Sequence, residues 1–142
     1  GGGDIPEDGL EALACAMKSD WCKKDPNHKR RHIIAVFTDA PTHELGFGKA
    51  SSDYPAGMPR NFDELTQMWG NKLNREGSMD YSAKRLILFI PKVEYLPAGD
   101  GWKNIVEGSM PWENCDVVQI NPKDEFKDVK FNRILDRIVN SI

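Results

Sequence analysis

Two aspartates, Asp4 and Asp39, are the residues of this sequence whose placement could support metal chemistry. Asp4 precedes an apolar helical stretch, and Asp39 directly follows the β-branched run "HIIAVFT". In a β-α-β unit the helix runs antiparallel to the strands, so the start of the helix and the end of the strand meet at one edge of the sheet. Open α/β sheets bind ligands at that edge. Carboxylates are hard oxygen ligands, and the pair therefore predicts a Mg²⁺, Mn²⁺ or Ca²⁺ site.

Residues close to the two aspartates could support this metal site. They are Gly3, Glu7, Thr38, Thr42 and His43. The threonines could add hydroxyl oxygens, and glycine would let the backbone approach closely. Asp4 and Glu7 also fit a helix capping box, so Asp4 could cap the first helix, bind metal, or do some of both. His43 could ligate the ion, or it could orient the loop by hydrogen bonds.

The motifs of common enzyme classes are absent from the sequence. It contains no G-x-S-x-G, P-loop, H-E-x-x-H or Cys–His pair. His43 beside Asp39 is the single candidate base. The sequence therefore favours a binding function, and a metal-assisted hydrolase or phosphotransferase is the alternative.

Length and charge restrict the kind of molecule and partner. The 142 residues are 39% hydrophobic and 29% charged, which predicts one globular domain. A net charge of -3 argues against nucleic acid or an anionic membrane as the partner. No apolar stretch approaches the ~20 residues of a membrane span. The three cysteines have no C-x-x-C spacing, which indicates reduced thiols and a cytoplasmic location.

Apolar periodicity predicts alternating helices and strands. Helices are expected from Asp4 to about Trp21, from Asn61 through Leu73, at 101–108 and near 125–141; strands are expected at 32–38, 85–91 and 115–121. The predicted core includes Cys15, Cys115, Leu65, Met68, Trp69, Leu73, Phe131, Ile134, Leu135, Ile138 and Val139. The order predicts a three-layer α/β fold with a mainly parallel sheet.

Three strands are few for such a sheet. We expect further strands from an upstream segment or from a partner, and we expect the isolated chain to be poorly stable or to self-associate through an open edge. The long Gly- and Pro-rich loop from Ala40 to Pro59 lies at the ligand-binding edge. Its apolar residues Phe47 and Tyr54 are the expected partner contacts.

The motifs "GGGDIPEDGLEAL" and "TDAPTH", with Trp21 between them, resemble the von Willebrand factor type A (vWA) domain. The resemblance is to its bacterial and intracellular branch, whose members often read GGGDxPE and TDAPxH. It spans residues 1–142 but only the latter part of the family domain, because the first strand and its DxSxS loop have no counterpart.

The resemblance implies a Rossmann-like α/β fold with a metal-ion-dependent adhesion site. Asp4 matches the second metal loop of the family, and Asp39 matches the third. The implied function is metal-dependent binding of an acidic residue on a partner protein. Metal binding is expected only if an upstream DxSxS loop is supplied.

Overall fold

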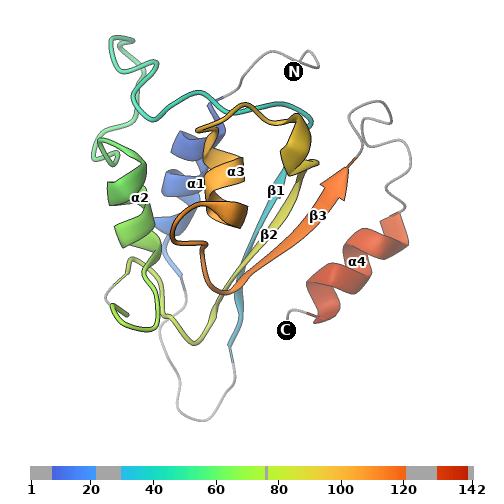
Figure 1. The fold of residues 1–142 in the computed structure, drawn as a ribbon. Coiled ribbons are helices and arrows are strands. Elements are labelled where there is room, and N and C mark those ends of the chain that lie inside the picture. Colours follow the sequence, from blue (N-terminus) through green and yellow to red (C-terminus); the bar gives the residue numbers. More distant parts are fainter. Residues whose placement is uncertain (1–7, 22–29, 76, 121–130, 141–142) are drawn as a thin grey trace.

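The computed structural model describes residues 8–21, 30–75, 77–120 and 131–140 (Figure 1). Its elements are α1 (Gly9–Met17), β1 (His32–Phe37), α2 (Phe62–Trp69), β2 (Lys84–Pro91), the 3₁₀ turn η1 (Val93–Tyr95), α3 (Gly101–Glu107), β3 (Cys115–Ile120) and α4 (Phe131–Asn140). Helices and strands alternate, so the predicted α/β class is confirmed.

Across the described residues, the sheet has three parallel strands in the order β1-β2-β3. His32 pairs with Lys84 at the start of β1, and Leu86 pairs with Cys115 at the start of β3. The central strand is apolar on both faces, and Leu86 through Ile90 are fully buried. Such a continuous apolar run is typical of a parallel strand that is covered on both sides.

Helices lie on both faces of the sheet (Figure 1). One face packs against α1, α2 and α3, which contribute Leu13, Trp69 and Trp102 to the main core. The other face forms a smaller cluster around Ile87 and Phe89. There α4 lies beside β3 and packs through Ile138. The β1 end of this second face is less covered than its β3 end.

The first helix is shorter than predicted. It ends at Met17 rather than near Trp21, whose indole N–H donates to the Met17 carbonyl at 3.3 Å. Asp8 occupies the N-cap position and makes no capping hydrogen bond with its side chain. The predicted capping box of Asp4 and Glu7 lies outside the described residues.

The second helix begins where the sequence predicts it. Asn61 caps it by accepting from the Glu64 N–H at 2.9 Å. It ends at Trp69, because Gly70 has a φ of 79° that takes the chain out of the helix. Leu73 therefore lies beyond the helix and is 89% exposed, so its predicted place in the apolar stripe is wrong.

Three other core predictions are wrong. Cys15 is exposed on α1. Leu135 and Val139 are exposed on α4, which turns only part of its apolar surface toward the sheet. The side chains of Phe131 and Ile134 lie outside the described part of the chain, whereas Cys115 packs against the main core as predicted.

Among the described residues, no helix is both long and apolar enough to span a bilayer.

Candidate functional site

Asp39 lies just beyond the carboxyl end of β1. The preceding residue, Thr38, makes the last sheet contact by donating its N–H to the Phe89 carbonyl at 3.0 Å. Asp39 is half-buried, and its carboxylate makes no hydrogen bond or ion pair with another described residue. A carboxylate in this position is available to a ligand at the edge where α/β sheets bind them.

The two threonines near Asp39 are buried and shape the loop. The Thr38 hydroxyl accepts from the Ala40 N–H at 3.2 Å, which closes a tight turn around Asp39. Thr42 donates its N–H to the Asp100 carboxylate at 2.8 Å and its hydroxyl to the His43 carbonyl at 3.1 Å. These contacts hold the start of the loop in one conformation.

Asp100 is a buried carboxylate that the sequence reasoning missed. It caps α3 by accepting from the Trp102 N–H at 3.0 Å, and it also accepts from Thr42. Burial raises its pKa, and the backbone N–H groups oppose that change. An Asp directly before a short helical segment is a standard capping signal, so the sequence did contain the information.

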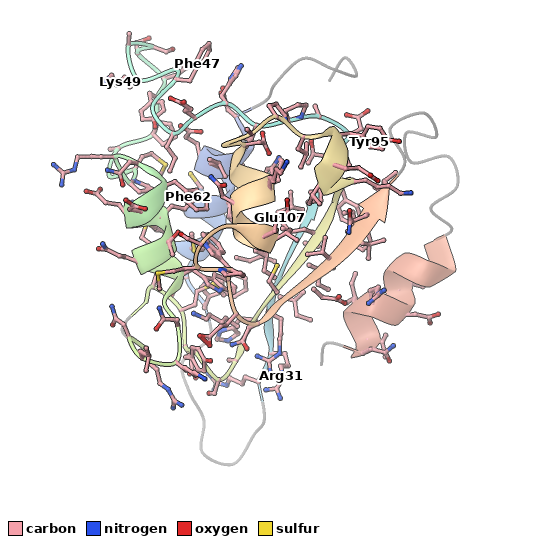
Figure 2. The ribbon with its side chains drawn as sticks, in the orientation of Figure 1. Arg31, Phe47, Lys49, Phe62, Tyr95 and Glu107 are labelled. Carbon is pink, nitrogen blue, oxygen red and sulfur yellow. The ribbon has the colours of Figure 1, made fainter. Side chains whose placement is uncertain are left out.

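His43 pairs with the first turn of α1. Its Nδ1 lies 2.7 Å from the Asp8 carboxylate, and its ring stacks on Phe47 with centroids 3.8 Å apart. Phe47 is 69% exposed and lies near the outer tip of the loop (Figure 2). The arrangement shows His43 making the loop-orienting hydrogen bond that was one of its two predicted roles.

Glu11 fastens the same loop to α1. The side chain of Glu11 is charged and buried. Its Oε2 accepts from the Gly46 N–H and from the Tyr54 hydroxyl, both at 2.9 Å. Burial and the neighbouring Glu11 raise the pKa of Tyr54. Tyr54 is half-buried with its hydroxyl toward α1, so it presents less surface to a partner than Phe47 does.

The structure brings Asp8, Thr38, Asp39, Thr42 and His43 to the carboxyl end of β1. Gly3, Asp4 and Glu7 lie outside the described residues. Within residues 8–21, 30–75, 77–120 and 131–140, no group of three or more His, Cys, Asp or Glu side chains is placed to hold a metal ion. A metal site that includes Asp39 needs donors beyond this part of the chain.

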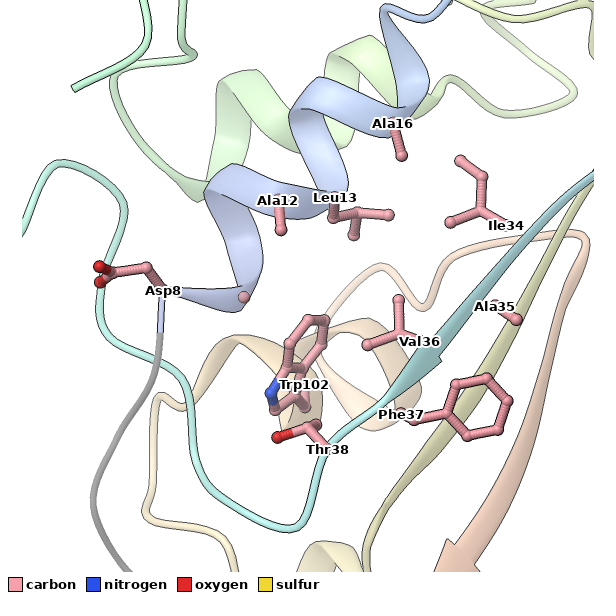
Figure 3. A pocket seen from close by; sticks show the side chains of 11 residues that line it. Asp8, Ala12, Leu13, Ala16, Ile34, Ala35, Val36, Phe37, Thr38 and Trp102 are labelled. Atoms are coloured by element: carbon pink, nitrogen blue, oxygen red, sulfur yellow. The ribbon is translucent and has the colours of Figure 1, made fainter. Parts of the chain in front are cut away.

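A groove runs between α1 and β1, along the edge of β1 that pairs with no other described strand (Figure 3). It has a volume of about 430 Å³. Asp8 and Thr38 both line it, and its walls are mainly apolar, with the indole of Trp102 among them. The groove begins at the same end of the sheet as the loop that carries Asp39.

No protein-family model matches the chain, and comparisons with curated proteins and with solved structures find no match either. The α/β class is shown by the structure, and the vWA resemblance depends on the quoted motifs alone.

Proposed function

We propose that this chain is the latter part of a vWA-type domain that binds a partner protein through a divalent metal ion. Asp39 and Asp4 would hold the ion, and Gly3, Glu7, Thr38 and Thr42 would support the surrounding loops. The observation that carries the proposal is the position of Asp39, a half-buried carboxylate that directly follows the parallel strand β1. That position fits a ligand for a hard cation.

The described donors suit Mg²⁺, Mn²⁺ or Ca²⁺ in type, since the groups at this edge are oxygen donors. They are too few to hold an ion by themselves. We therefore propose that Asp4 and an upstream DxSxS loop complete the site. When bound, the ion would supply an open coordination position for an acidic side chain of the partner.

The loop around Phe47 supports the partner-binding part of the proposal. Phe47 is an exposed aromatic side chain held over His43, and His43 is held by Asp8. Exposed aromatic side chains on anchored loops are frequent contacts at protein interfaces. Together with net charge -3, these features favour a protein partner over nucleic acid or membrane. We place the module in the cytoplasm because its cysteines show no disulfide framework.

The enzyme alternative depends on the pairing of His43 with Asp8. A carboxylate that holds Nδ1 leaves Nε2 as a base for metal-assisted hydrolysis. The binding proposal predicts that His43→Gln leaves metal binding intact. Metal-dependent hydrolysis of phosphate esters that His43→Gln removes would favour the enzyme instead.

The metal proposal is tested by calorimetry on the chain with its upstream polypeptide. Mg²⁺, Mn²⁺ or Ca²⁺ should bind and stabilise the fold by about 2.7 kcal/mol at a hundredfold excess over Kd. Asp39→Ala should abolish the response, and so should Asp4→Asn, which removes the negative charge and keeps the size of the side chain. Glu44→Ala removes an exposed acid from the same loop and should leave the response unchanged. Metal binding that survives Asp39→Ala would contradict the proposal.

A further inference from the structure

We propose that Arg31 and Arg85 form a binding site for the phosphate group of a phosphomonoester. Arg31 directly precedes β1 and Arg85 lies near the start of β2, so both are at the amino end of the parallel sheet. Asp39 follows the opposite end of β1, and Figure 2 shows Arg31 and Phe47 at opposite ends of the molecule. The phosphate site therefore does not depend on the metal site or on the proposed function.

A tight turn before β2 fixes the carbonyl group to which both arginines bind. In this turn the Asp80 carboxylate accepts from the Ser82 N–H at 3.1 Å and from the Ser82 hydroxyl at 2.9 Å. The Ala83 carbonyl accepts from the His32 N–H at 2.9 Å, which ties the turn to the start of β1. Because the turn is anchored at both residues, the carbonyl oxygen of Ser82 has a defined position at the start of the two strands.

The two guanidinium groups meet at that carbonyl oxygen. Arg31 Nη1 donates to the Ser82 oxygen at 3.4 Å, and Arg85 Nη1 donates to the same oxygen at 3.2 Å. Each Nη1 also donates to a second main-chain carbonyl: Arg31 to that of Arg30 at 2.8 Å, and Arg85 to that of Lys84 at 2.6 Å. Main-chain contacts therefore hold the two cations side by side.

This pair of cations has no counter-ion among the described residues. Burial lowers the pKa of Arg85, and the neighbouring charge of Arg31 lowers it further. The ion pairs of the described residues involve other groups, and Asp116 on the adjacent strand pairs with Arg137 at 2.9 Å. Like charges that are held together repel each other, and a bound anion would remove that repulsion.

Each arginine keeps the part of its guanidinium group that binds anions. The carbonyl contacts use Nη1, and the Nε and Nη2 groups make no hydrogen bond with another described residue. Nε and Nη2 form a planar fork that can donate to two oxygens of one oxyanion. Both side chains are half-buried, so part of each remains accessible to a ligand.

The chemistry of the pair fits a phosphate monoester better than a carboxylate. A monoester carries close to two negative charges at pH 7 and three terminal oxygens, so one group can neutralise both arginines and accept from both forks. A carboxylate has one charge and two oxygens, which a single guanidinium group satisfies. A nucleic acid repeats its charge along a chain, and the net charge of -3 disfavours such a partner.

NMR titration tests the site on the chain with its upstream polypeptide, with EDTA present so that metal binding plays no part. The probes are inorganic phosphate and a short phosphoserine peptide whose other residues are neutral. The Nε resonances of Arg31 and Arg85 should shift with both probes and reach saturation. The Nε resonance of Arg60, which pairs with Glu64, is the internal control and should not shift.

The two probes also distinguish the source of the phosphate group. Equal affinity for inorganic phosphate and for the phosphoserine peptide would support a small phosphate compound as the ligand. Tighter binding of the peptide would support a phosphorylated segment of a protein. Both results agree with the phosphate site.

Variants test whether the two forks bind the phosphate. Arg31→Gln and Arg85→Gln should each raise the Kd of the phosphoserine peptide about 10-fold, because each removes a charged, bidentate donor. Arg85→Lys keeps the charge but loses the fork, and it should also weaken binding. Arg60→Gln removes the same charge from an exposed side chain elsewhere and should leave the Kd unchanged. The amide spectrum of each variant shows whether the fold is retained.

Four outcomes would overturn the proposal. The first is the absence of any shift at Arg31 and Arg85 with either probe. The second is a Kd that Arg31→Gln and Arg85→Gln do not change, or that Arg60→Gln raises equally. The third is succinate, a dicarboxylate, binding as tightly as phosphate. The fourth is a thymidine oligonucleotide binding more tightly than the phosphoserine peptide, which would make a phosphodiester the ligand.

Discussion

The ammonium group of Lys84, on β2, donates a hydrogen bond to the carbonyl oxygen of Trp69, the last residue of α2. It also donates to the Gly70 carbonyl at 3.4 Å and lies over the rings of Trp69 and Tyr81. Lys84 is 1% exposed. A buried cation thus closes the carboxyl end of α2, where the helix dipole favours positive charge. Burial nevertheless lowers the pKa of Lys84 to about 8, and Glu113 opposes that change.

The lowered pKa of Lys84 predicts that stability rises at alkaline pH. Between pH 8 and 10.5 the unfolded chain binds more protons at this residue than the folded chain does. The contribution of Lys84 to the free energy of unfolding should therefore increase across that window, by at most about 3 kcal/mol, while the raised pKa of Cys115 acts in the opposite direction above pH 9. Thermal unfolding at several pH values measures this dependence. Lys84→Met should remove the increase, and an unchanged pH profile in that variant would refute the assignment to Lys84.

Asp100 should stabilise the fold mainly through the backbone N–H groups that its carboxylate accepts from. Asp100→Ala leaves the N–H groups of Thr42 and Trp102 without their acceptor and should cost about 1–3 kcal/mol. Asp100→Asn should lose less, because Asn caps helices about as well as Asp. Denaturant titration gives these values. Asp63→Ala, at an exposed position in the first turn of α2, is the control and should change stability by less than about 0.5 kcal/mol.

Phe47 and Tyr54, both expected to contact a partner, should differ in their effect on stability. Phe47→Ala removes an exposed ring and should cost less than about 1 kcal/mol while weakening partner binding. Tyr54→Phe removes a donor to the buried carboxylate of Glu11 and should cost about 1–3 kcal/mol. Urea unfolding of the two variants separates these cases. Equal losses of stability would mean that Phe47 packs as tightly as Tyr54.

The two described cysteines should react differently with a thiol reagent. Cys15 is exposed, whereas burial raises the pKa of Cys115 to about 12. In a Cys22→Ser background, the native chain should expose one reactive thiol and the urea-unfolded chain two. Cys15→Ser should remove the fast reaction. Rapid labelling of Cys115 in the native state would show that β3 opens readily.

Features that depend on neighbouring residues were predictable from the sequence. β1, β2 and β3 are short, largely apolar runs, and α2 has Asn61 at its start, so each element carries its signal within a few residues. Gly70 also indicates the end of α2, whereas the apolar spacing through Leu73 predicts a longer helix. The position of Asp39 at the end of β1 also follows from this local pattern.

Features that depend on distant contacts could not be read in the same way. Glu11 is buried because Gly46 and Tyr54 supply donors from a remote loop. Cys15, on the same helix, is exposed. Leu135 and Val139 are exposed, whereas Ile138 is the described apolar side chain of α4 that packs against the sheet. The apolar spacing within α1 or α4 does not show which distant segments of the chain will pack against each helix.

The buried central strand has a consequence for how fast this chain folds. His32 pairs with Lys84 across 52 residues of sequence, and Leu86 pairs with Cys115 across 29. Both pairings give the native sheet a high contact order. The entropy of closing these long loops is lost before the strand contacts stabilise the sheet, which slows folding. We therefore expect folding in the slower range for its size, during which the apolar residues Leu86–Ile90 stay open to association with other chains.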